Sequence, residues 1–314
     1  MSKCLYCYRE LSEGEHDFHP SCAMKFFGTP HVPQLNYTLD ELDALAAQII
    51  KDQTSLTGVQ PKLSLHLKEH EGSQRLTIVG LWGAYICKPQ TSLYPMLPEI
   101  EDLTMHLAEE AKISVVPHTL MRMSDQSLCY LTKRVDRTPT GEKVAMEDMC
   151  QLTERQTEYK YKSSYERIGK AIAQYSAMPK MDTTNFYEIV LFSWLMGNND
   201  MHLKNFSLYA PDEQGYRLVP AYDLLNASIA NPKDTEELAL TLNGRRKRLT
   251  HDDFISAAMT MGVEQTTAEH LIKKYVRLLP KFIKKIDESF LSEELKQKYT
   301  ALLIQRTKII SQVK

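Results

Sequence analysis

Three polar side chains in the second half of the chain have the spacing of a phosphoryl-transfer site. Asp200 and Asn205 lie five positions apart, and Asp223 follows two short strand-like stretches. Phosphoryl transfer needs a carboxylate that accepts the proton of the attacking hydroxyl, and oxygen ligands that hold Mg²⁺. Asp200 fits the first role, and Asn205 and Asp223 fit the second. Lys204 could neutralise charge on the transferred group, because a compact ammonium suits a phosphate oxygen.

A nucleotide site also needs cations for the phosphates, and the first half of the chain offers two of them. Lys88 ends an alternating strand-like stretch, and Glu101 on the next predicted helix could pair with it and orient it. The segment from Ser55 to Lys62 contains Gly58 and could cover phosphates with its backbone N–H groups, with the lysine beside them.

Each of these residues also has an ordinary structural interpretation. An isolated lysine is usually solvated, a lone Asp is more often a turn or cap residue than a metal ligand, and one glycine is a weak sign of a phosphate-binding loop. The order along the chain favours the chemical interpretation: a loop, a strand lysine, a helix glutamate, and then the Asp and Asn residues after a helical segment.

A second group of candidate ligands lies near the start of the chain. Cys4 and Cys7 form one pair, and His19 and Cys22 form another, which is the spacing of a zinc knuckle. Three thiolates and one imidazole could close a tetrahedral, structural zinc site in a segment too short to have its own core. Alternatively, the thiols pack as small apolar groups without metal. The sequence leaves both interpretations open.

The first 135 residues predict a mixed α/β part. A capping box at Thr38–Glu41 begins a helix that ends near Gln53, and Gly58 and Pro61 prevent its continuation. Apolar alternation predicts several strands, and another helix begins at Pro98. The predicted strands are 63–67, 75–79, 84–88 and a pair around Asp125 that ends at Lys133.

The second half has mainly helical periodicity. The predicted helices are 164–175, 185–195, 268–277 and 293–310, and the predicted strands are 206–209, 216–219 and 237–241. The fold class is therefore α+β, with a small mixed α/β N-lobe and a mainly helical C-lobe. We expect a Cys/His segment over 1–30, the N-lobe over 31–135 and the catalytic C-lobe over 136–314.

The composition is that of an ordinary globular protein of 314 residues, with 43% hydrophobic and 25% charged residues. It excludes a disordered tail and a disulfide miniprotein. Lys and Arg number 38 against 40 Asp and Glu, so nothing indicates a nucleic-acid polyelectrolyte. The longest apolar run, Ile189–Met196, is far shorter than the roughly 20 residues of a membrane span. We therefore expect a cytoplasmic protein that does not bind a membrane.

Six motifs can be compared with known families. They are Ser-Leu-Thr-Gly-Val-Gln-Pro-Lys (55–62), Tyr-Ile-Cys-Lys (85–88), Lys-Arg-Val-Asp-Arg (133–137), Glu-Asp-Met-Cys-Gln (147–151), Asn-Asp-Met-His-Leu-Lys-Asn-Phe-Ser (199–207) and Ala-Tyr-Asp (221–223). In this order they resemble the motifs of the HipA-type toxin serine/threonine kinases, from about residue 50 onward. The resemblance implies a kinase-like bilobal fold, ATP and Mg²⁺ as cofactors, and toxicity through phosphorylation of an aminoacyl-tRNA synthetase.

The resemblance also implies a role for each matching position. Asp200 would be the catalytic acid/base residue, and Lys88 the phosphate-binding lysine. The other implied positions are Thr57, Gly58, Val59, Gln60, Pro61 and Lys62 in the ATP loop, Lys133, Arg134 and Val135 in the adenine hinge, His202, Leu203, Lys204 and Asn205 along the nucleotide, and Tyr222 with Asp223 on the metal side.

The family also uses a serine of the ATP loop for regulatory autophosphorylation, and Ser55 occupies that position, with Thr57 as a second hydroxyl. A phosphate here would add nearly two negative charges beside those of ATP, so modification should inhibit. The alternative is that both hydroxyls only satisfy backbone groups of the loop.

Long members of the family carry a whole domain before the ATP loop, whereas here the loop arrives by residue 55. The sequence therefore resembles the short, HipT-like branch, which implies a separate small HipS-like protein and a DNA-binding HipB-like antitoxin as partners. DNA would be met only through the antitoxin. The basic run Arg245–Arg248 could touch DNA phosphates in such a complex, but it is more often a solvated face.

Two other functions compete with a protein kinase. Asp200, His202 and Asn205 also resemble the catalytic loop of phosphoinositide kinases, which would mean a lipid or small-molecule acceptor. A catalytically silent binding module in a repressor complex is the third possibility, although it predicts loss of the base and metal positions, and these are present. No motif identifies the acceptor protein.

Overall fold

The computed structural model describes residues 2–42, 44–45, 62–70, 73–79, 83–138 and 141–312. The chain divides into two compact units, which are described separately. Unit 1 contains Met1–Asp102, Val116–Glu142 and Glu288–Phe290, and unit 2 contains Leu103–Val115, Lys143–Asp287 and Leu291–Lys314. The predicted ATP-loop positions Ser55, Thr57, Gly58, Val59, Gln60 and Pro61 lie outside the described residues.

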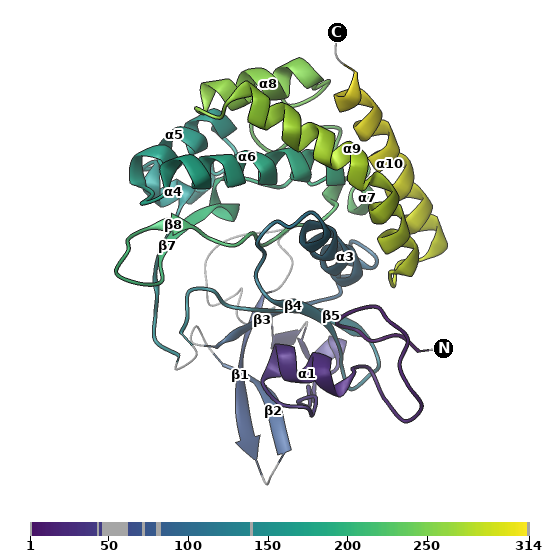
Figure 1. Cartoon of the computed structure of the whole chain (residues 1–314). Helices are drawn as coiled ribbons and strands as arrows, with labels where there is room; N and C mark the ends of the chain where they lie inside the picture. Colours follow the sequence, from purple (N-terminus) through teal and green to yellow (C-terminus); the bar gives the residue numbers. More distant parts are fainter. Residues whose placement is uncertain are drawn as a thin grey trace. The chain divides into compact units, whose positions relative to one another are not determined.

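Unit 1 contains an antiparallel five-stranded sheet in the order β2-β1-β3-β5-β4 (Figure 1). Alternating apolar residues form its strands, because alternate side chains point to the same face of a pleated sheet. The strands are β1 (Leu63–His70), β2 (Ser73–Ile78), β3 (Tyr85–Pro89), β4 (His118–Arg122) and β5 (Leu128–Lys133). They confirm the strands predicted for this half of the chain.

Strand β3, which pairs with β5, carries an apolar side chain on one face of the sheet and a charged one on the other. Cys87 pairs with Leu131, and Lys88 pairs with Tyr130. Since neighbouring residues of a strand point to opposite faces, Cys87 joins a buried apolar cluster while Lys88 points the other way. The strand therefore fixes the direction of the lysine side chain.

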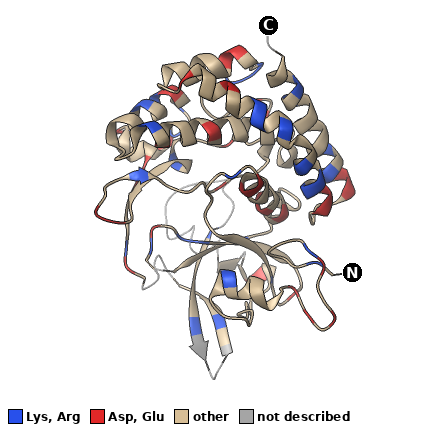
Figure 2. Ribbon diagram, viewed as in Figure 1, with Lys and Arg blue, Asp and Glu red and all other residues tan. Residues whose placement is uncertain are grey.

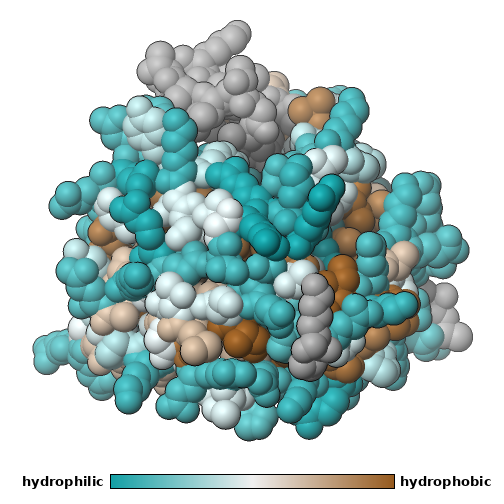
Figure 3. All heavy atoms as spheres, turned by 90° about the horizontal axis from the view of Figure 1, so that it is seen from above, coloured by the Kyte–Doolittle hydropathy of each residue, from teal (hydrophilic) through white to brown (hydrophobic). Residues whose placement is uncertain are grey.

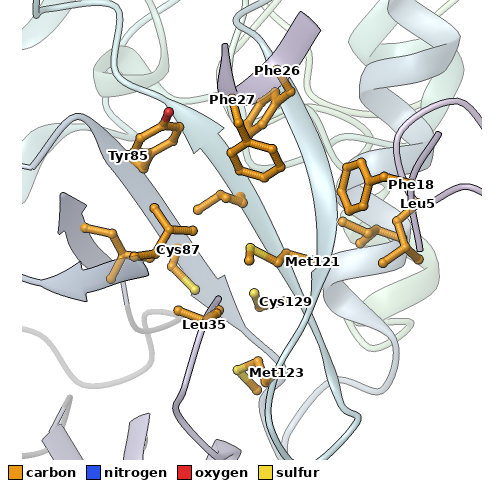
Figure 4. Close-up of a cluster of buried hydrophobic side chains, with 14 of the residues drawn as sticks. Leu5, Phe18, Phe26, Phe27, Leu35, Tyr85, Cys87, Met121, Met123 and Cys129 are labelled. Carbon is orange, nitrogen blue, oxygen red and sulfur yellow. The ribbon is translucent and has the colours of Figure 1, made fainter. Parts of the chain in front are cut away.

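The segment before the sheet covers the apolar cluster with helix α1 (Pro20–Phe27). Phe26 and Phe27 point toward the strands beside Tyr85, as Figure 4 shows. Helix α1 begins with Pro20 at its first turn and ends at Gly28, whose positive φ of 81° suits a glycine C-cap. The core of unit 1 is thus shared between the sheet and the Cys/His segment.

Two helix starts predicted for this half are confirmed. Thr38 and Glu41 form the predicted capping box, with the Thr38 N–H donating to Glu41 Oε2 at 2.8 Å and the Glu41 N–H donating to Thr38 Oγ1 at 3.2 Å. The helix predicted from Pro98 is α3 (Leu97–Glu110), whose residues are divided between the two units.

Unit 2 is built around helix α6 (Pro179–Met196), which is buried along most of its C-terminal half. The longest apolar run of the sequence is therefore a buried helix, against which α5 and α10 pack. The other elements are α4 (Met149–Leu152), α5 (Tyr165–Tyr175), α7 (Ala227–Ala230), α8 (His251–Thr260), α9 (Gln265–Glu288), α10 (Glu293–Ser311), the 3₁₀ turns η1 (Thr157–Tyr159) and η2 (Leu203–Asn205), and the sheet strands β6 (Ala145–Asp148), β7 (Ser207–Ala210) and β8 (Arg217–Leu218).

The strand predicted over 237–241 is wrong. This stretch is irregular, and only Thr241 forms an isolated bridge, with Ser164. Leu238, Ala239 and Leu240 are buried one after another rather than alternately. These apolar residues are therefore part of a buried loop and not of a strand.

Strand β6 and helix α8 were not predicted. The predicted helices at α5, α6, α9 and α10 and the predicted strands at β7 and β8 are confirmed.

The surface over the helices of unit 2 is mainly hydrophilic, with separate apolar areas (Figure 3). Exposed large apolar side chains on these helices include Met259, Val276 and Ile304. Scattered apolar residues of this kind are normal on globular proteins. Among the described residues, no helix is both long and apolar enough to cross a membrane.

Candidate active site

The loop that carries Asp200 begins where helix α6 ends. Gly197 follows the helix with a left-handed backbone, at a φ of +79°. A Cβ at this position would lie only 2.5 Å from Oδ1 of Asn226, so both the conformation and the space require glycine. This turn directs the chain into residues 198–206, which hold Asp200 and Asn205.

Within the loop, Asn205 fixes the backbone of Asp200. The Asn205 side-chain amide donates to the Asp200 carbonyl at 3.0 Å, and Asn205 itself is buried. With its nitrogen committed to this bond, the amide oxygen of Asn205 is the atom that could ligate a cation. The predicted base Asp200 and the predicted metal ligand Asn205 are thus close in space as well as in sequence.

A buried asparagine joins this loop to the segment that carries Asp223. The Asp200 N–H donates to Asn198 Oδ1 at 3.2 Å, and Asn198 Nδ2 donates to the Asp223 carbonyl at 3.3 Å. Asn198 is fully buried. Its one side chain therefore sets the backbone positions of both acidic residues, a role that the sequence analysis did not assign.

Asp223 itself has a positive φ of 56°. Asp tolerates this left-handed region better than most residues, but it is uncommon, and such backbone occurs often at functional sites. The neighbouring Tyr222 donates its hydroxyl to the Lys204 carbonyl at 3.1 Å and shares a second hydrogen bond of 2.7 Å with Ser207. The predicted metal-side pair is therefore tied to the loop of Asp200.

Two aromatic rings flank the Asp200 carboxylate. Tyr161 donates its hydroxyl to Asp200 Oδ1 at 2.6 Å, and its ring meets the ring of His202 edge-on at 5.0 Å. Burial, together with the charge of Asp200, raises the pKa of Tyr161, so it stays a donor at neutral pH. Burial lowers the pKa of His202 to about 4, so the imidazole is neutral, and its Nδ1 has no hydrogen-bond partner among the described residues.

Lys204 points to a carboxylate rather than standing alone. Its ammonium donates to Asp148 Oδ2 at 2.7 Å. Asp148 also caps helix α4, where its side chain accepts from the Gln151 N–H. Asp148 and Gln151 lie in the motif of residues 147–151, to which the sequence analysis gave no chemical role. Leu203 is buried in η2, next to the lysine.

In unit 1, Lys88 and Glu101 form the predicted pair. Lys88 Nζ donates to Glu101 Oε1 at 2.5 Å, and the side chains are only 4% and 1% exposed. The ammonium also lies 5.3 Å from the centre of the Tyr130 ring. A buried pair of this kind holds the lysine in one orientation, because separating two buried opposite charges costs several kcal/mol, on the order of 3–5.

The predicted hinge residues begin with Lys133, the last residue of strand β5. The Lys133 ammonium lies 5.4 Å from the Phe26 ring centre, and burial lowers its pKa. Arg134 donates to Asp136 at 2.8 and 2.6 Å. Burial alone would raise the pKa of Asp136, but Arg134 and the neighbouring Arg137 hold it below its ordinary value. Val135 is partly buried between them, and Lys62, which precedes β1, is exposed.

The remaining candidates fall outside these two groups. The zinc candidates Cys4, Cys7, His19 and Cys22 lie together in unit 1. In the basic run, Arg246 donates to the Tyr161 carbonyl at 2.6 Å, and Lys247 approaches Glu236 at 3.3 Å. These local partners favour a structural role for the run. Lys and Arg are interspersed with Asp and Glu along the long helices of unit 2 (Figure 2).

The structure thus brings the candidates together in two groups. Unit 2 gathers the predicted Asp200, His202, Lys204, Asn205, Tyr222 and Asp223. Unit 1 pairs Lys88 with Glu101. Sequence reasoning missed Asn198, Tyr161 and Asp148. For Asn198 the available signal was its place directly after the helix-ending glycine, and for Asp148 it was the motif of residues 147–151.

Comparison with curated proteins finds relatives that carry kinase names. The chain is 25% identical over 289 residues to a Haemophilus influenzae protein named "Putative kinase", with 83% of this chain and 82% of that protein covered. It is 33% identical over 221 residues to "Putative kinase Y4dM" of Sinorhizobium fredii, of which it spans about half, 53%.

Comparison with solved structures confirms the predicted fold class. A chain of the Shewanella oneidensis toxin–antitoxin complex of HipA, HipB and operator DNA matches with a TM-score of 0.68 and 20% identity, covering 91% of this chain and 75% of that one. The Helicobacter pylori proinflammatory kinase CtkA matches with a TM-score of 0.53 and 15% identity, covering 79% and 94%. The fold is α+β and kinase-like, with a mixed α/β part and a mainly helical part.

The family model described as "HipA-like C-terminal domain" matches residues 54–282, which is most of the chain and includes both groups of candidate residues. The protein therefore belongs to the HipA-like C-terminal domain family.

Proposed function

We propose that this protein is an ATP-dependent serine/threonine protein kinase that acts as a toxin. The observation that carries the proposal is the pair of hydrogen bonds made by the buried Asn198 side chain. One bond holds the backbone of Asp200 and the other holds the backbone of Asp223. A carboxylate held beside a candidate metal ligand is the arrangement that phosphoryl transfer requires. The kinase names of the relatives and the kinase-like fold support the same assignment.

The donor set suits Mg²⁺ and ATP. Asn205 and Asp223 offer the oxygen ligands that Mg²⁺ prefers, and Lys88, oriented by Glu101, offers an ammonium to phosphate oxygens. ATP would supply the transferable phosphoryl group, with its charge offset by the metal. The segment from Thr57 to Lys62 is proposed as the phosphate-covering loop, and residues 133–135 as the adenine hinge.

Asp200 is proposed to accept the proton of the attacking hydroxyl. Its carboxylate already accepts a hydroxyl hydrogen bond at 2.6 Å, from Tyr161. A serine or threonine hydroxyl of a substrate would make the same kind of bond. The acceptor must therefore displace Tyr161 or share the carboxylate with it. Because the His202 imidazole is neutral, it places no positive charge beside the Asp200 carboxylate.

The acceptor and the partners are proposed from the family. The Shewanella structure contains HipA with HipB and operator DNA. By analogy, an antitoxin of the HipB type would bind this protein and link it to DNA. Membership of the short HipT-like branch, with a small HipS-like partner, an aminoacyl-tRNA synthetase as substrate and a cytoplasmic location, belongs to the same proposal.

Transfer of labelled γ-phosphate from ATP to proteins of a cytosolic extract tests the activity. Wild type should label an extract protein or itself, and Asp200→Asn should lower the rate by at least ~100-fold, since loss of a general base costs about 10²–10⁴-fold. Asp212→Asn is the matched control, because Asp212 is exposed and pairs with Arg217. It should retain the wild-type rate.

Three results would contradict the proposal. Absence of label with wild type would favour a silent binding module, and equal rates for wild type and Asp200→Asn would remove the proposed base. Label found on lipids or small molecules instead of protein would favour the other kinase class. Phosphoproteomics after induced expression then identifies the acceptor, for which we expect a hydroxyl of an aminoacyl-tRNA synthetase.

A further inference from the structure

A cluster of three thiols and one imidazole lies in unit 1 and contains none of the candidate kinase residues. The ligand atoms of Cys4, Cys7, His19 and Cys22 all lie within 4.8 Å of one another. Cys7 Sγ is 3.6 Å and Cys22 Sγ is 3.7 Å from His19 Nδ1. A tetrahedral zinc centre, with bonds of about 2.3 Å to sulfur and about 2.0 Å to nitrogen, places such S and N atoms about 3.6 Å apart. The spacing therefore fits one metal ion bound by all four side chains.

The local backbone aims these side chains at one point. The Cys4 N–H donates to the Arg9 carbonyl at 2.8 Å, and the Tyr8 N–H donates to the Cys4 carbonyl at 2.9 Å. Tyr8 has a positive φ of 66°, so the chain turns tightly just after Cys7. His19 caps helix α1, and Cys22 lies in its first turn. A hairpin-like turn and a helix start thus each supply two ligands.

The imidazole is oriented as a metal ligand would be. His19 Nε2 lies 3.0 Å from the Glu10 carbonyl, which can only accept, so this nitrogen carries the proton and Nδ1 presents its lone pair to the thiols. Packed thiols without metal would not require this orientation. All six cysteines are unpaired, so no disulfide competes for Cys4, Cys7 or Cys22.

We propose that Cys4, Cys7, His19 and Cys22 bind one structural Zn²⁺ ion. Three thiolates and one imidazole in tetrahedral spacing are the donor set typical of zinc. A two-iron cluster would need ligands on opposite irons to lie much further apart than 4.8 Å. With four protein ligands no position is left for a substrate, so the site is structural.

The metal site supports the sheet that carries Lys88. Helix α1, whose N-cap residue is the ligand His19, places the centre of the Phe26 ring 6.0 Å from that of Tyr85, the first residue of strand β3 (Figure 4). Lys133 on strand β5 lies over the same Phe26 ring. From the other side of the knuckle, Tyr8 donates its hydroxyl to Asp102 at 2.6 Å, next to Glu101. Loss of zinc should therefore loosen β3 and β5.

Metal analysis of the purified full-length protein tests the site without any activity assay. We expect about one zinc per chain in wild type and less than ~0.2 in His19→Ala. His16→Ala is the matched control, because His16 is an exposed imidazole of the same loop and belongs to neither of the candidate metal clusters among the described residues. This variant should retain about one zinc. His19→Cys, which restores a fourth soft ligand, should also retain the metal.

The wild-type chain provides a test that does not depend on variants folding. Exchange of zinc for Co²⁺ should give the visible absorption and sulfur-to-metal charge transfer of a tetrahedral thiolate site. Less than ~0.2 metal per chain in protein purified with added zinc would overturn the proposal. So would an octahedral cobalt spectrum, stoichiometric iron in place of zinc, or equal metal loss in His16→Ala and His19→Ala.

Hydrogen exchange tests the link to the sheet. Removal of zinc by a chelator should raise amide exchange at least ~10-fold in Tyr85–Pro89 and Leu128–Lys133, and leave α10 of unit 2 unchanged as an internal reference. Unchanged exchange in β3 and β5 would overturn the supporting role of the metal. None of these measurements involves phosphotransfer, so they stand or fall separately from the kinase assignment.

Discussion

Replacement of Asn198 by alanine is the sharpest test of how the acidic residues are positioned. The change removes the acceptor of the Asp200 N–H and the donor to the Asp223 carbonyl, at 3.2 and 3.3 Å. It leaves every proposed chemical group in place. A loss of phosphotransfer in Asn198→Ala would therefore measure positioning alone.

The expected magnitude follows from the two bonds. Each is worth about 1 kcal/mol net, and a partner left without a hydrogen bond adds to that cost, so we expect the free energy of unfolding to fall by ~2–3 kcal/mol. A shift of the Asp200 carboxylate by about 1 Å can cost about 100-fold in rate. We therefore expect kcat/KM to fall by ~10²-fold in protein that is still folded.

Asn199→Ala is the matched control for this test. Asn199 is also buried, but within the described part of the chain its amide donates to the Glu236 carbonyl, at 3.1 Å, and to neither acidic residue of the site. It should lower the free energy of unfolding by ~1–2 kcal/mol and change kcat/KM less than ~3-fold. The assays are urea unfolding and transfer of labelled γ-phosphate, at a temperature where both variants are folded. Equal losses of kcat/KM in the two variants, or a folded Asn198→Ala with unchanged kcat/KM, would refute the reasoning.

Three further predictions concern other residues. Lys88→Met should abolish detectable phosphotransfer. It should also lower the free energy of unfolding by ~3–5 kcal/mol, because the buried Glu101 carboxylate loses the ammonium that pairs with it. The double variant with Glu101→Leu should recover part of the stability but no activity. Burial lowers the pKa of His202 from 6.5 to about 4, so the unfolded chain binds more protons between these values. Stability should thus be full above pH 6.5 and fall by up to roughly 3 kcal/mol towards pH 4, and urea unfolding of His202→Gln should lack this part of the pH dependence. Ser55→Ala should increase growth arrest on induced expression, and mass spectrometry that finds no phosphate on the ATP loop of wild type, with unchanged arrest, would exclude the proposed switch.

Local patterns predicted most of the fold. The strands of unit 1 and the long helices of unit 2 follow from alternation and helical periodicity, and the capping box at Thr38 and Glu41 forms as expected. The stretch 237–241 shows where this reasoning fails, because consecutive buried residues such as Leu238 and Ala239 occur in a packed loop as well as in a strand. Strand β6 has no apolar alternation, and its partner β7 is distant in sequence.

The candidate site was predictable where its residues are close in sequence. Asp200 and Asn205 lie in one short stretch of sequence, which made both predictable. The hydrogen bond from Asn198 to Asp223 joins residues 25 positions apart, and the one from Tyr161 to Asp200 joins residues 39 positions apart. Such contacts depend on how two loops meet, which no local pattern encodes. The same holds for the Cys/His cluster, where our proposal of a metal ion rather than packed thiols rests partly on the contact between His19 Nε2 and the Glu10 carbonyl.

Lys88 and Lys204, two of the lysines proposed to contact phosphate, differ in how firmly an ion pair holds them. Lys88 and Glu101 are both buried, so separating these opposite charges in the interior costs several kcal/mol. Lys204 pairs with Asp148, but its side chain is 38% exposed, and an ion pair in contact with water is worth about 1 kcal/mol or less. Lys88 is therefore fixed before any nucleotide binds, whereas Lys204 can exchange Asp148 for a phosphate oxygen at little cost. The sequence did not distinguish these two lysines, because each was a candidate to contact phosphate. Their different burial shows that Lys88 is held in place whereas Lys204 can change its partner.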